Sequence, residues 1–243
     1  MNECFKQLEK LFLDIKSMRY IEAQFNDCGA AGKTFEKLIN KDLDNKPLAD
    51  FLSIEIKVSS FINKYPITLF SLFPESYNKT SEESIRCLIS NYGYSNNSFI
   101  KKLAINVKSN KIKYCKNGFG FMLKISYKWK KIYLCVFHKN KVIDTSFSWS
   151  FKKLYIIFEK KLKYLAYVTY FQKRSYSKRY FYYYDMIFYI LKSYGSFIKA
   201  IEDGIISISF NISLDYSNIL RYHGVNFVIY YKDFNYIYDK ICK

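Results

Sequence analysis

The sequence predicts an α/β fold with a mixed central sheet, and three observations lead to this expectation. Of the 243 residues 50% are hydrophobic and 20% are aromatic, which is enough apolar surface to form a core. Stretches with a helical period and stretches with the period of strands follow one another without strict alternation. Only 8 Gly and 3 Pro are present, and neither a linker nor an internal repeat is visible, so we expect one domain over residues 1–243.

Helices are expected where apolar side chains recur every three to four residues. The first of them places Phe5, Leu8 and Phe12 on one side, and a late one is closed by Gly204. The expected helices are 2–18, 34–40, 80–92, 150–165, 186–203 and a last one at the C-terminus.

Strands are expected where apolar and polar residues alternate. Ile54 and Ile56 alternate in this way with Glu55 and Lys57. The expected strands are 54–58, 65–74, a meander of short runs within 103–148, 164–172, 179–184, 205–214 and 227–231. The stretch RYHGVN, residues 221–226, is expected to be a loop that leads to the last strand.

The charge balance predicts a polyanionic partner. Lys and Arg total 39 and Asp and Glu total 21, which gives a net charge of +18. Such an excess favours nucleic acid or an anionic membrane surface as the partner. Only five of the basic residues are Arg, and AT-rich codons encode the frequent Lys, Asn, Ile, Tyr and Phe, so codon usage is an alternative source of part of the charge.

The composition also excludes several classes of protein. No segment approaches the roughly 18 apolar residues of a membrane span, and the N-terminus carries acids and does not resemble a secretory signal. We therefore expect a cytoplasmic protein without a membrane partner. The six Cys form no CxxC pair and only two His are present, which favours reduced thiols over a structural zinc.

One short pattern, Asp50-x4-Glu55-x-Lys57, carries candidate chemistry. Glu55 and Lys57 point to the same face of the expected strand, about 7 Å apart, and a turn can bring Asp50 beside Glu55. Two converging carboxylates repel each other unless a cation lies between them, and Mg²⁺ prefers such oxygen ligands. A neighbouring Lys can stabilise charge on a phosphate or orient the attacking water. The alternative is a solvated face on which Glu and Lys pair across strands.

The pattern is that of the PD-(D/E)XK nucleases, and its surroundings resemble the MvaI/BcnI restriction endonucleases and, more distantly, the mismatch-repair nickase MutH. The matching stretches are a glycine-containing turn entering a helix at 29–36, the strand at 50–57, a Thr-Leu-Phe stretch at 68–74, and His223-Gly224 followed by Phe227. The sequence departs from the family where Ser53 replaces Gly and where Val225 follows the His-Gly pair in place of Thr.

This resemblance implies both a fold and an activity. The fold is a PD-(D/E)XK nuclease core, a mixed central sheet flanked by helices, in a MutH-like architecture whose two lobes grip DNA. The activity is that of a type II restriction endonuclease, which hydrolyses double-stranded DNA at a short near-palindromic site, requires Mg²⁺ and leaves 5′-phosphate and 3′-hydroxyl ends. The resemblance also implies a monomer that cuts one strand at a time, and a cognate DNA methyltransferase in the same system that makes no direct contact.

The resemblance assigns catalytic roles to five residues. Asp50, Glu55 and the main-chain carbonyl of Ile56 are metal ligands, and Lys57 contacts the scissile phosphate or the attacking water. Glu36 reaches the metal site from its helix. From periodicity alone, Glu36 is instead an exposed helix residue that pairs with a nearby Lys.

Other residues are expected to contact DNA. They are Lys33 and Thr34 near a helix start, Lys161 in a basic helix, and Arg221, Tyr222 and His223 in the expected loop. The tract 173–184 interleaves cations with aromatic residues, so it could stack on bases or follow a phosphate backbone, and its alternative is a strand with one buried face. For His223 the alternative is a loop residue bonded to the local backbone.

Two alternative functions stay open from the sequence. One is a MutH-like strand-nicking repair endonuclease. The other is a non-catalytic basic nucleic-acid-binding protein, which would bind without regard to metal and would not cleave.

Overall fold

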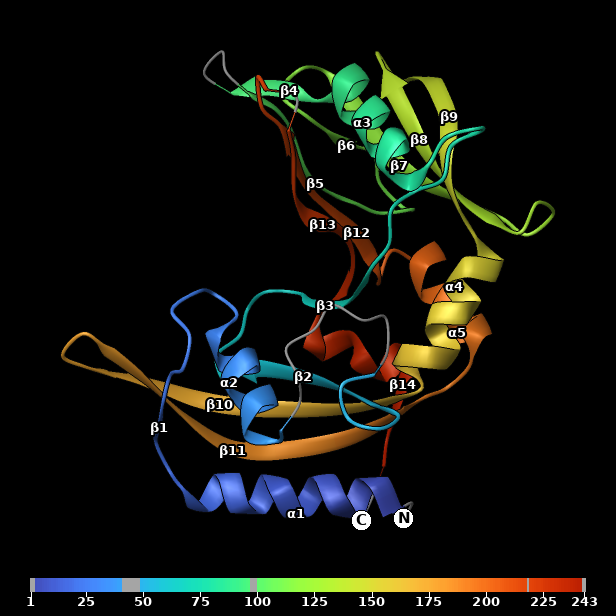
Figure 1. The fold of residues 1–243 in the computed structure, drawn as a ribbon. Helices are drawn as coiled ribbons and strands as arrows, with labels where there is room; N and C mark the ends of the chain where they lie inside the picture. Colours follow the sequence, from blue (N-terminus) through green and yellow to red (C-terminus); the bar gives the residue numbers. More distant parts are fainter. Residues whose placement is uncertain (1–2, 41–48, 97–99, 218, 242–243) are drawn as a thin grey trace. The chain divides into compact units, whose positions relative to one another are not determined.

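The computed structural model describes residues 3–40, 49–96, 100–217 and 219–241, and the chain forms two compact units. Unit 1 comprises residues 1–65, 156–192 and 237–243, and unit 2 comprises residues 66–155 and 193–236 (Figure 1). Each unit is therefore built from segments that are distant in the sequence. In the described part of the chain, no helix is both long enough and apolar enough to span a membrane.

Unit 1 contains a mixed sheet, as the sequence predicted. Its strands follow the order β1-β11-β10-β2, with β14 beside β11, and only the pair β10 and β2 is parallel. The elements of unit 1 are α1 (Glu3–Ser17), β1 (Ile21–Glu22), α2 (Ala30–Leu38), β2 (Ile54–Ser60), the π-helix η1 (Phe158–Leu162), β10 (Tyr164–Ser175), β11 (Lys178–Leu191) and β14 (Tyr238–Lys240).

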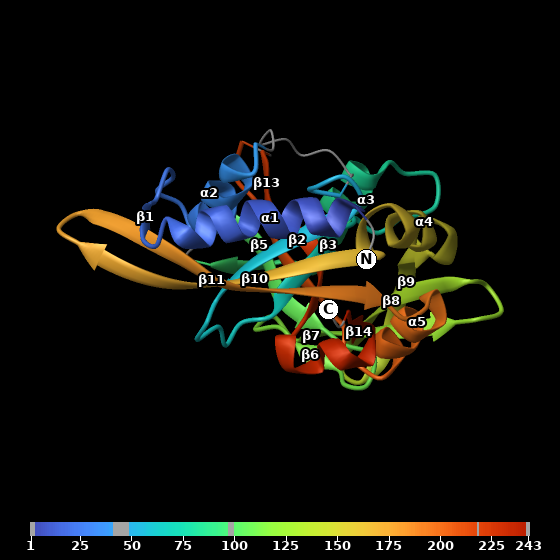
Figure 2. The same cartoon turned by 90° about the horizontal axis from the view of Figure 1, so that it is seen from below.

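Helices α1 and α2 pack on one face of this sheet, and Figure 2 shows α1 running alongside β10 and β11. Ile54 and Ile56 of β2 join the core that both helices form, together with Ala166 and Val168 of β10. Because side chains alternate along a strand, Glu55 and Lys57 lie on the opposite face of β2. The predicted alternation at 54–58 thus places the apolar residues of β2 against the helices and its charged residues on the other face.

Unit 2 contains two antiparallel sheets, with orders β3-β13-β12-β5-β4 and β6-β7-β8-β9. The second sheet is the meander that the sequence predicted within 103–148. The elements are β3 (Ile67–Ser71), α3 (Ser81–Tyr92), β4 (Tyr94–Asn96), β5 (Ile100–Val107), β6 (Lys113–Tyr114), β7 (Phe119–Ser126), β8 (Lys131–His138), β9 (Lys141–Ser150), α4 (Phe151–Ile157), α5 (Tyr194–Glu202), β12 (Ser207–Leu214), β13 (Leu220–Ile229) and the 3-10 helix η2 (Tyr231–Tyr236). Helix α3 begins at a capping box in which Thr80 and Glu83 exchange hydrogen bonds.

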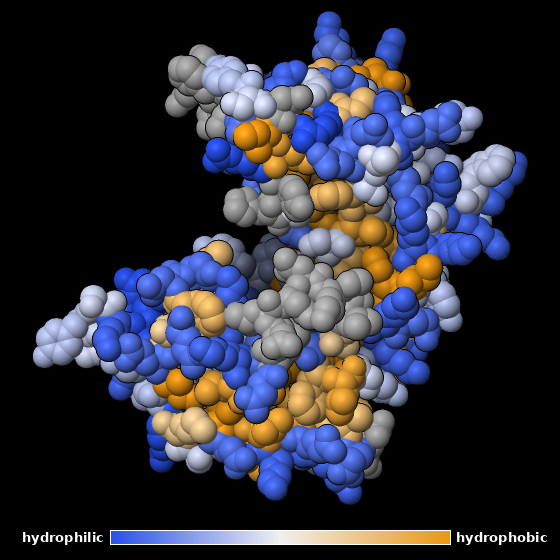
Figure 3. Space-filling view, in the orientation of Figure 1, coloured by the Kyte–Doolittle hydropathy of each residue, from blue (hydrophilic) through white to orange (hydrophobic). Residues whose placement is uncertain are grey.

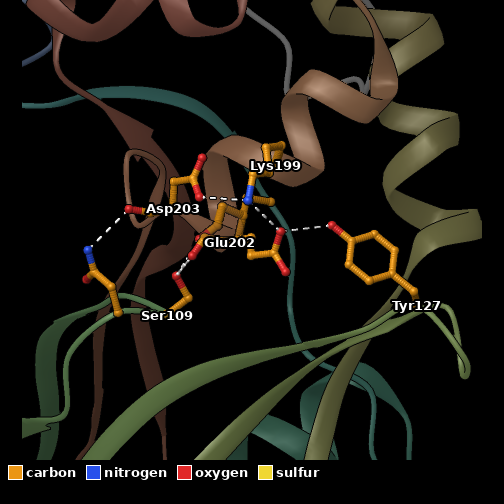
Figure 4. Close-up of polar contacts among 7 residues, drawn as sticks. Ser109, Tyr127, Lys199, Glu202 and Asp203 are labelled. Atoms are coloured by element: carbon orange, nitrogen blue, oxygen red, sulfur yellow. Dashed lines mark hydrogen bonds and ion pairs between the residues drawn. The ribbon is translucent and has the colours of Figure 1, made fainter.

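The C-terminal end of α5 is held by a side chain from the loop after β5 (Figure 4). Ser109 Oγ lies 2.6 Å from the carbonyl oxygen of Ile201 and also contacts that of Glu202, two carbonyls of the last turn of the helix. Gly204 has φ +71° and ends the helix as the sequence predicted.

Three charged side chains at the same helix end, Lys199, Glu202 and Asp203, form what we call the α5 cluster (Figure 4). Lys199 Nζ lies 3.1 Å from Glu202 Oε2 and 3.0 Å from Asp203 Oδ1, and Tyr127 donates its hydroxyl hydrogen to Glu202 Oε2 at 3.1 Å. These two carboxylates raise the pKa of Lys199. Every member of the cluster therefore has a partner of opposite charge.

Four expectations about elements were wrong. Residues 186–191 continue β11 in register with β10, and the helix expected at 186–203 is limited to α5, which begins after the capping residue Ser193. Residues 221–226 lie within β13, where a bulge sets two residues opposite Asn211 and Gly224 has φ +103°. The C-terminal helix is replaced by η2 and β14, and α2 begins at Ala30, inside the expected glycine loop.

Candidate active site

A tight turn before β2 places Asp50 beside the strand. The amide of Phe51 donates to the carbonyl of Ile54 at 2.9 Å, and the amide of Ile54 donates back at 2.8 Å. Within this turn the left-handed conformation, φ +54°, is taken by Leu52. Ser53, which stands where the family has Gly, is therefore not the residue that needs the conformational freedom of glycine. Asp50 Oδ2 accepts a hydrogen bond from the amide of Ile56 at 2.9 Å. The predicted approach of Asp50 to the strand is thus present in the structure.

Glu55 is the most deeply buried member of the site, with 1% of its surface exposed. Its Oε1 accepts a hydrogen bond from Lys57 Nζ at 2.6 Å, and Lys161 Nζ lies 3.5 Å from the same oxygen. Its Oε2 is buried and has no hydrogen-bond partner among the described residues. One carboxylate oxygen is therefore shared by two ammonium groups, whereas the other is left without a partner.

The electrostatics of Glu55 are dominated by its burial. Burial raises the pKa of this carboxyl above its usual range, and the charge of Asp50 raises it further. The ammonium groups of Lys57 and Lys161 lower the pKa but do not outweigh these causes. A buried carboxylate whose charge is not fully compensated is costly to the fold, so an additional cation at this point would be favourable.

The residues around Glu55 fit a hard divalent metal ion. Asp50 and Glu55 supply carboxylate oxygens, the free Oε2 of Glu55 is a ready ligand, and the Ile56 carbonyl follows directly in the chain. In the described residues, no group of three or more His, Cys, Asp and Glu side chains could hold a metal. Glu36, half-buried on α2, is therefore not grouped with the other two acids, and its role stays a prediction.

Two lysines flank the carboxylates from different elements. Lys57 comes from β2 and has 20% of its side chain exposed, and Lys161 comes from η1 with 23% exposed. A π-helix is a rare local geometry that is often found at functional sites. Here it buries Phe158 and Leu162 and directs Lys161 to Glu55. Lys161 thus lies near the candidate active site, as the sequence suggested.

Sequence reasoning missed Tyr238 of β14. Its ring is buried, its hydroxyl donates to the carbonyl of Leu162 at 3.2 Å, and this contact fixes the end of η1 that carries Lys161. Burial raises the pKa of Tyr238, and the charge of Glu55 raises it further. No signal in the sequence could have found this residue, because 183 positions separate it from Glu55.

The residues expected to bind DNA near α2 differ in exposure. Lys33 is exposed, pairs with Asp27 and lies 5.8 Å from the centre of the Phe25 ring. Thr34 is fully buried, and its Oγ1 accepts the amide hydrogen of Gln24 at 3.2 Å. The phosphate contact expected for Thr34 was therefore wrong, because its hydroxyl is buried and binds the Gln24 amide.

The residues expected in a recognition loop lie on β13 of unit 2. Arg221 is exposed, and its Nε lies 3.3 Å from Asp215 Oδ2. The side chains of Tyr222 and His223 lie outside the described part of the structure. Their roles, like that of Arg221, stay predictions.

Comparisons with known proteins identify the family and the fold of the chain. No protein in a curated set of sequences matches the chain. Two solved structures are similar at 26% identity, and each comparison covers 99% of this chain and 98% of the other. They are the restriction endonuclease MvaI in complex with cognate DNA, with a TM-score of 0.89, and MvaI in the absence of DNA, with a TM-score of 0.64.

The family model of the MvaI/BcnI restriction endonucleases matches residues 9–238. The match spans nearly the whole chain and includes Asp50, Glu55, Lys57 and Lys161. It confirms the family that the sequence motifs indicated. The chain belongs to the MvaI/BcnI restriction endonuclease family.

Proposed function

We propose that this type II restriction endonuclease hydrolyses both strands of double-stranded DNA at a short near-palindromic site with Mg²⁺, and that it leaves 5′-phosphate and 3′-hydroxyl ends. The observation that carries the proposal is the buried Glu55 carboxylate, which has one oxygen without a partner and lies beside Asp50 and two lysines. A similar solved structure is the MvaI complex with its cognate DNA, which supports duplex DNA as the substrate.

In this proposal Asp50, Glu55 and the Ile56 carbonyl hold the metal ion. A bound Mg²⁺ supplies charge stabilisation for the phosphate and lowers the pKa of a coordinated water. The turn at residues 51–54 and the hydrogen bond from the Ile56 amide keep the Asp50 carboxylate at the start of β2. The site is thereby assembled before substrate binds, which limits the reorganisation needed for catalysis.

Lys57 and Lys161 are proposed to act on the phosphate. In the described structure both ammonium groups are drawn to Glu55 Oε1. With a metal ion held by Glu55, the two lysines would be less strongly drawn to its Oε1 and would donate hydrogen bonds to a phosphate oxygen. Lys57 lies closer to Glu55 and is assigned the scissile phosphate, and Lys161 the neighbouring backbone.

The finer features of the system are also proposals. They are a monomeric enzyme that cuts one strand at a time, base reading by Arg221, Tyr222 and His223, and a cognate methyltransferase that makes no direct contact. A strand-nicking repair endonuclease is the alternative, because the same site would serve a single cut.

Plasmid cleavage tests the proposal. Supercoiled plasmid is incubated with the wild type and with Glu55→Gln, in Mg²⁺ and in EDTA. Discrete linear fragments that need both Mg²⁺ and Glu55, and whose ends ligate without repair, are the expected result. Nicked circles alone would favour the repair nickase, and metal-independent binding without cleavage would favour the non-catalytic alternative. Sequencing the fragment ends then maps the site.

A further inference from the structure

The hairpin formed by β10 and β11 extends beyond the rest of the unit 1 sheet (Figures 1 and 2). Strand β2 pairs with β10 only as far as Tyr170, and β1 pairs with β11 only at residues 180–181. We call residues 171–180 the hairpin arm. Near its end the two strands pair only with each other, and a ribbon of two strands is only marginally stable in water.

The arm carries a concentrated positive charge. Lys173, Arg174, Lys178 and Arg179 lie within seven positions, and no Asp or Glu occurs between residues 164 and 184. Arg174 and Arg179 are direct cross-strand partners in the register. Like charges placed opposite each other destabilise a strand pair, and an anionic ligand at this point would reduce the repulsion.

Three of the four cations have partners at the base of the arm. Arg179 donates to the carbonyl oxygens of Phe25 and Asp27 at 3.0 and 3.1 Å. Lys178 pairs with Glu22 at 2.9 Å, and Lys173 Nζ lies 3.9 Å from the centre of the Tyr20 ring. These contacts anchor the arm to the segment 20–27.

Arg174 makes no ion pair or side-chain hydrogen bond with any described residue. Three cations of the arm thus bind other parts of unit 1, and Arg174 is left available to a ligand. In Figure 3 the projecting end of unit 1 carries hydrophilic to neutral colours.

The tip of the arm holds an aromatic residue in an unfavourable conformation. The turn consists of Tyr176 and Ser177, and Tyr176 has φ +52°. Gly, Asn or Asp normally occupy such a position, and a bulky residue there is strained. The Tyr176 side chain is fully exposed, so no packing compensates for this cost. Strain of this kind is typical of residues that serve binding.

The register gives the distance of the arm from the active site along β10. By strand alternation Arg174 starts from the face of Ala166 and Val168, opposite Lys57, so its proposed contact is made around the edge of the two-stranded ribbon. Lys57 is paired with Tyr167 of β10, and Tyr176 follows nine positions later. At about 3.3 Å per residue the tip lies about 30 Å along the strand from Lys57. This distance corresponds to about 9 base pairs of duplex DNA, at about 3.4 Å for each.

We propose that the hairpin arm binds the sugar-phosphate backbone of duplex DNA that flanks the cleavage site, about 9 base pairs from the cut. Arg174 pairs with a phosphate, and Tyr176 packs against the sugars and donates its hydroxyl hydrogen to a phosphate oxygen, contacts that carry no sequence information. The position relative to the cut rests on the proposed function, whereas the binding of a polyanion by the arm does not.

Two substitutions test the arm without weakening the fold. Arg174→Gln removes a like-charge pair, and Tyr176→Asn places a tolerated residue at the left-handed position, so the thermal midpoint of the double variant should stay unchanged or rise. Lys10→Gln on α1 removes an exposed positive charge far along the chain from the arm and is the matched control. A double variant that unfolds at a lower temperature would contradict both the backbone strain assigned to Tyr176 and the repulsion assigned to the pair Arg174 and Arg179.

Binding is measured without metal, as a function of salt, on a 40-base-pair duplex and on a 14-base-pair duplex, both centred on the mapped cleavage site. We expect the double variant to bind the long duplex about tenfold more weakly. The slope of log K against log salt should become shallower by about 0.9 for each lost phosphate contact. Binding to the short duplex, which ends before the arm, and every property of Lys10→Gln should be unchanged.

Equal losses on both duplexes, or no loss on the long one, would overturn the proposal. Loss of binding to phosphatidylserine vesicles with DNA binding intact would also overturn it, because the arm would then serve a membrane. If the protein cleaves no plasmid, a random-sequence 40-base-pair duplex still shows whether the double variant lowers the salt slope. The experiment thereby distinguishes a wrong assignment of the cleavage activity from a wrong assignment of DNA binding to the hairpin arm.

Discussion

The active site and the α5 cluster are built from the same residue types, acids and lysines within a few positions, yet they differ in burial and in pairing. In the α5 cluster, the side chain of Lys199 is 60% exposed, and each carboxylate has a cationic partner. In the active site, Glu55 is buried and one of its oxygens has no partner among the described residues. The first arrangement stabilises a helix end, and the second keeps an unsatisfied charge inside the protein.

This difference distinguishes a paired surface cluster from the candidate metal site. A solvated cluster lowers its own energy by pairing and is screened by water, so it contributes little and needs no ligand. A buried carboxylate with one oxygen that accepts no hydrogen bond destabilises the folded protein, and a bound cation would reduce this cost. The motif alone does not distinguish these cases, because Glu and Lys two positions apart fit either one.

The largest expected effect is the loss of cleavage when a metal ligand is removed. Asp50→Asn and Glu55→Gln each delete a carboxylate charge from the proposed site, so cleavage in Mg²⁺ should fall below detection while DNA binding persists. The matched control is Glu202→Gln, the same change in the α5 cluster, which should cleave at the wild-type rate. Wild-type cleavage by either active-site variant would remove the basis for the metal site.

The two active-site lysines should differ in their effect on the rate. Lys57→Ala should lower the single-turnover cleavage rate by several orders of magnitude, because it removes a charge from the transition state. Lys161→Gln should cost less, since Lys161 lies farther from Glu55 Oε1, 3.5 Å against 2.6 Å for Lys57. Lys160→Gln is the matched control, because Lys160 is exposed on the same helix and should leave the rate unchanged. If Lys160→Gln lowered the cleavage rate as much as Lys161→Gln does, both effects would be explained by the loss of positive charge near DNA and not by a specific role of Lys161.

Removal of the Ser109 hydroxyl should have a moderate effect on stability and none on chemistry. Ser109→Ala leaves two carbonyls at the end of α5 without this donor, at a cost of about 1–2 kcal/mol. Thermal unfolding should show a decrease of about 2–4 °C for each kcal/mol. Ser17→Ala, which removes a similar bond at the exposed end of α1, should cost less. An unchanged midpoint for Ser109→Ala would show that water replaces the hydroxyl.

The same contrast explains how far the sequence could predict the molecule. Asp50, Glu55 and Lys57 lie within eight consecutive positions, so a turn and one strand are enough to bring them together. Lys161 and Tyr238 reach the site only through the pairing of β10 and β14 with their neighbours, which local periodicity does not contain. The burial of Glu55 also results from this packing, so the sequence alone does not predict it.

The error at residues 186–203 has a related cause. Residues 186–191 are an uninterrupted apolar run, in which the helical and strand periods cannot be told apart. Pairing with β10 decides in favour of a strand. Helix α3 was predicted correctly at 80–92 from its apolar period, and its capping box, Thr80 with Glu83, is a local signal of the kind that a sequence does contain.

The smallest expected effect is on the stability of the metal-free protein. Burial raises the pKa of Glu55 in the folded state, so the folded protein binds more protons than the unfolded chain between the unperturbed and the raised pKa. Its stability therefore falls as the pH rises through this interval. Glu55→Gln has no charge to bury, and in EDTA at pH 7.5 its thermal midpoint should lie a few degrees above that of the wild type.

This gain should disappear at about pH 4, where the carboxyl is largely protonated in both states. Mg²⁺ should stabilise the wild type but not Glu55→Gln, because a ligand that binds only the folded state raises its stability. The matched variant Glu202→Gln, whose side chain is only partly buried and fully paired, should show neither response. A lower midpoint for Glu55→Gln at pH 7.5 would mean that the ion pair with Lys57 outweighs the cost of burial, and the contrast with the α5 cluster would then not hold.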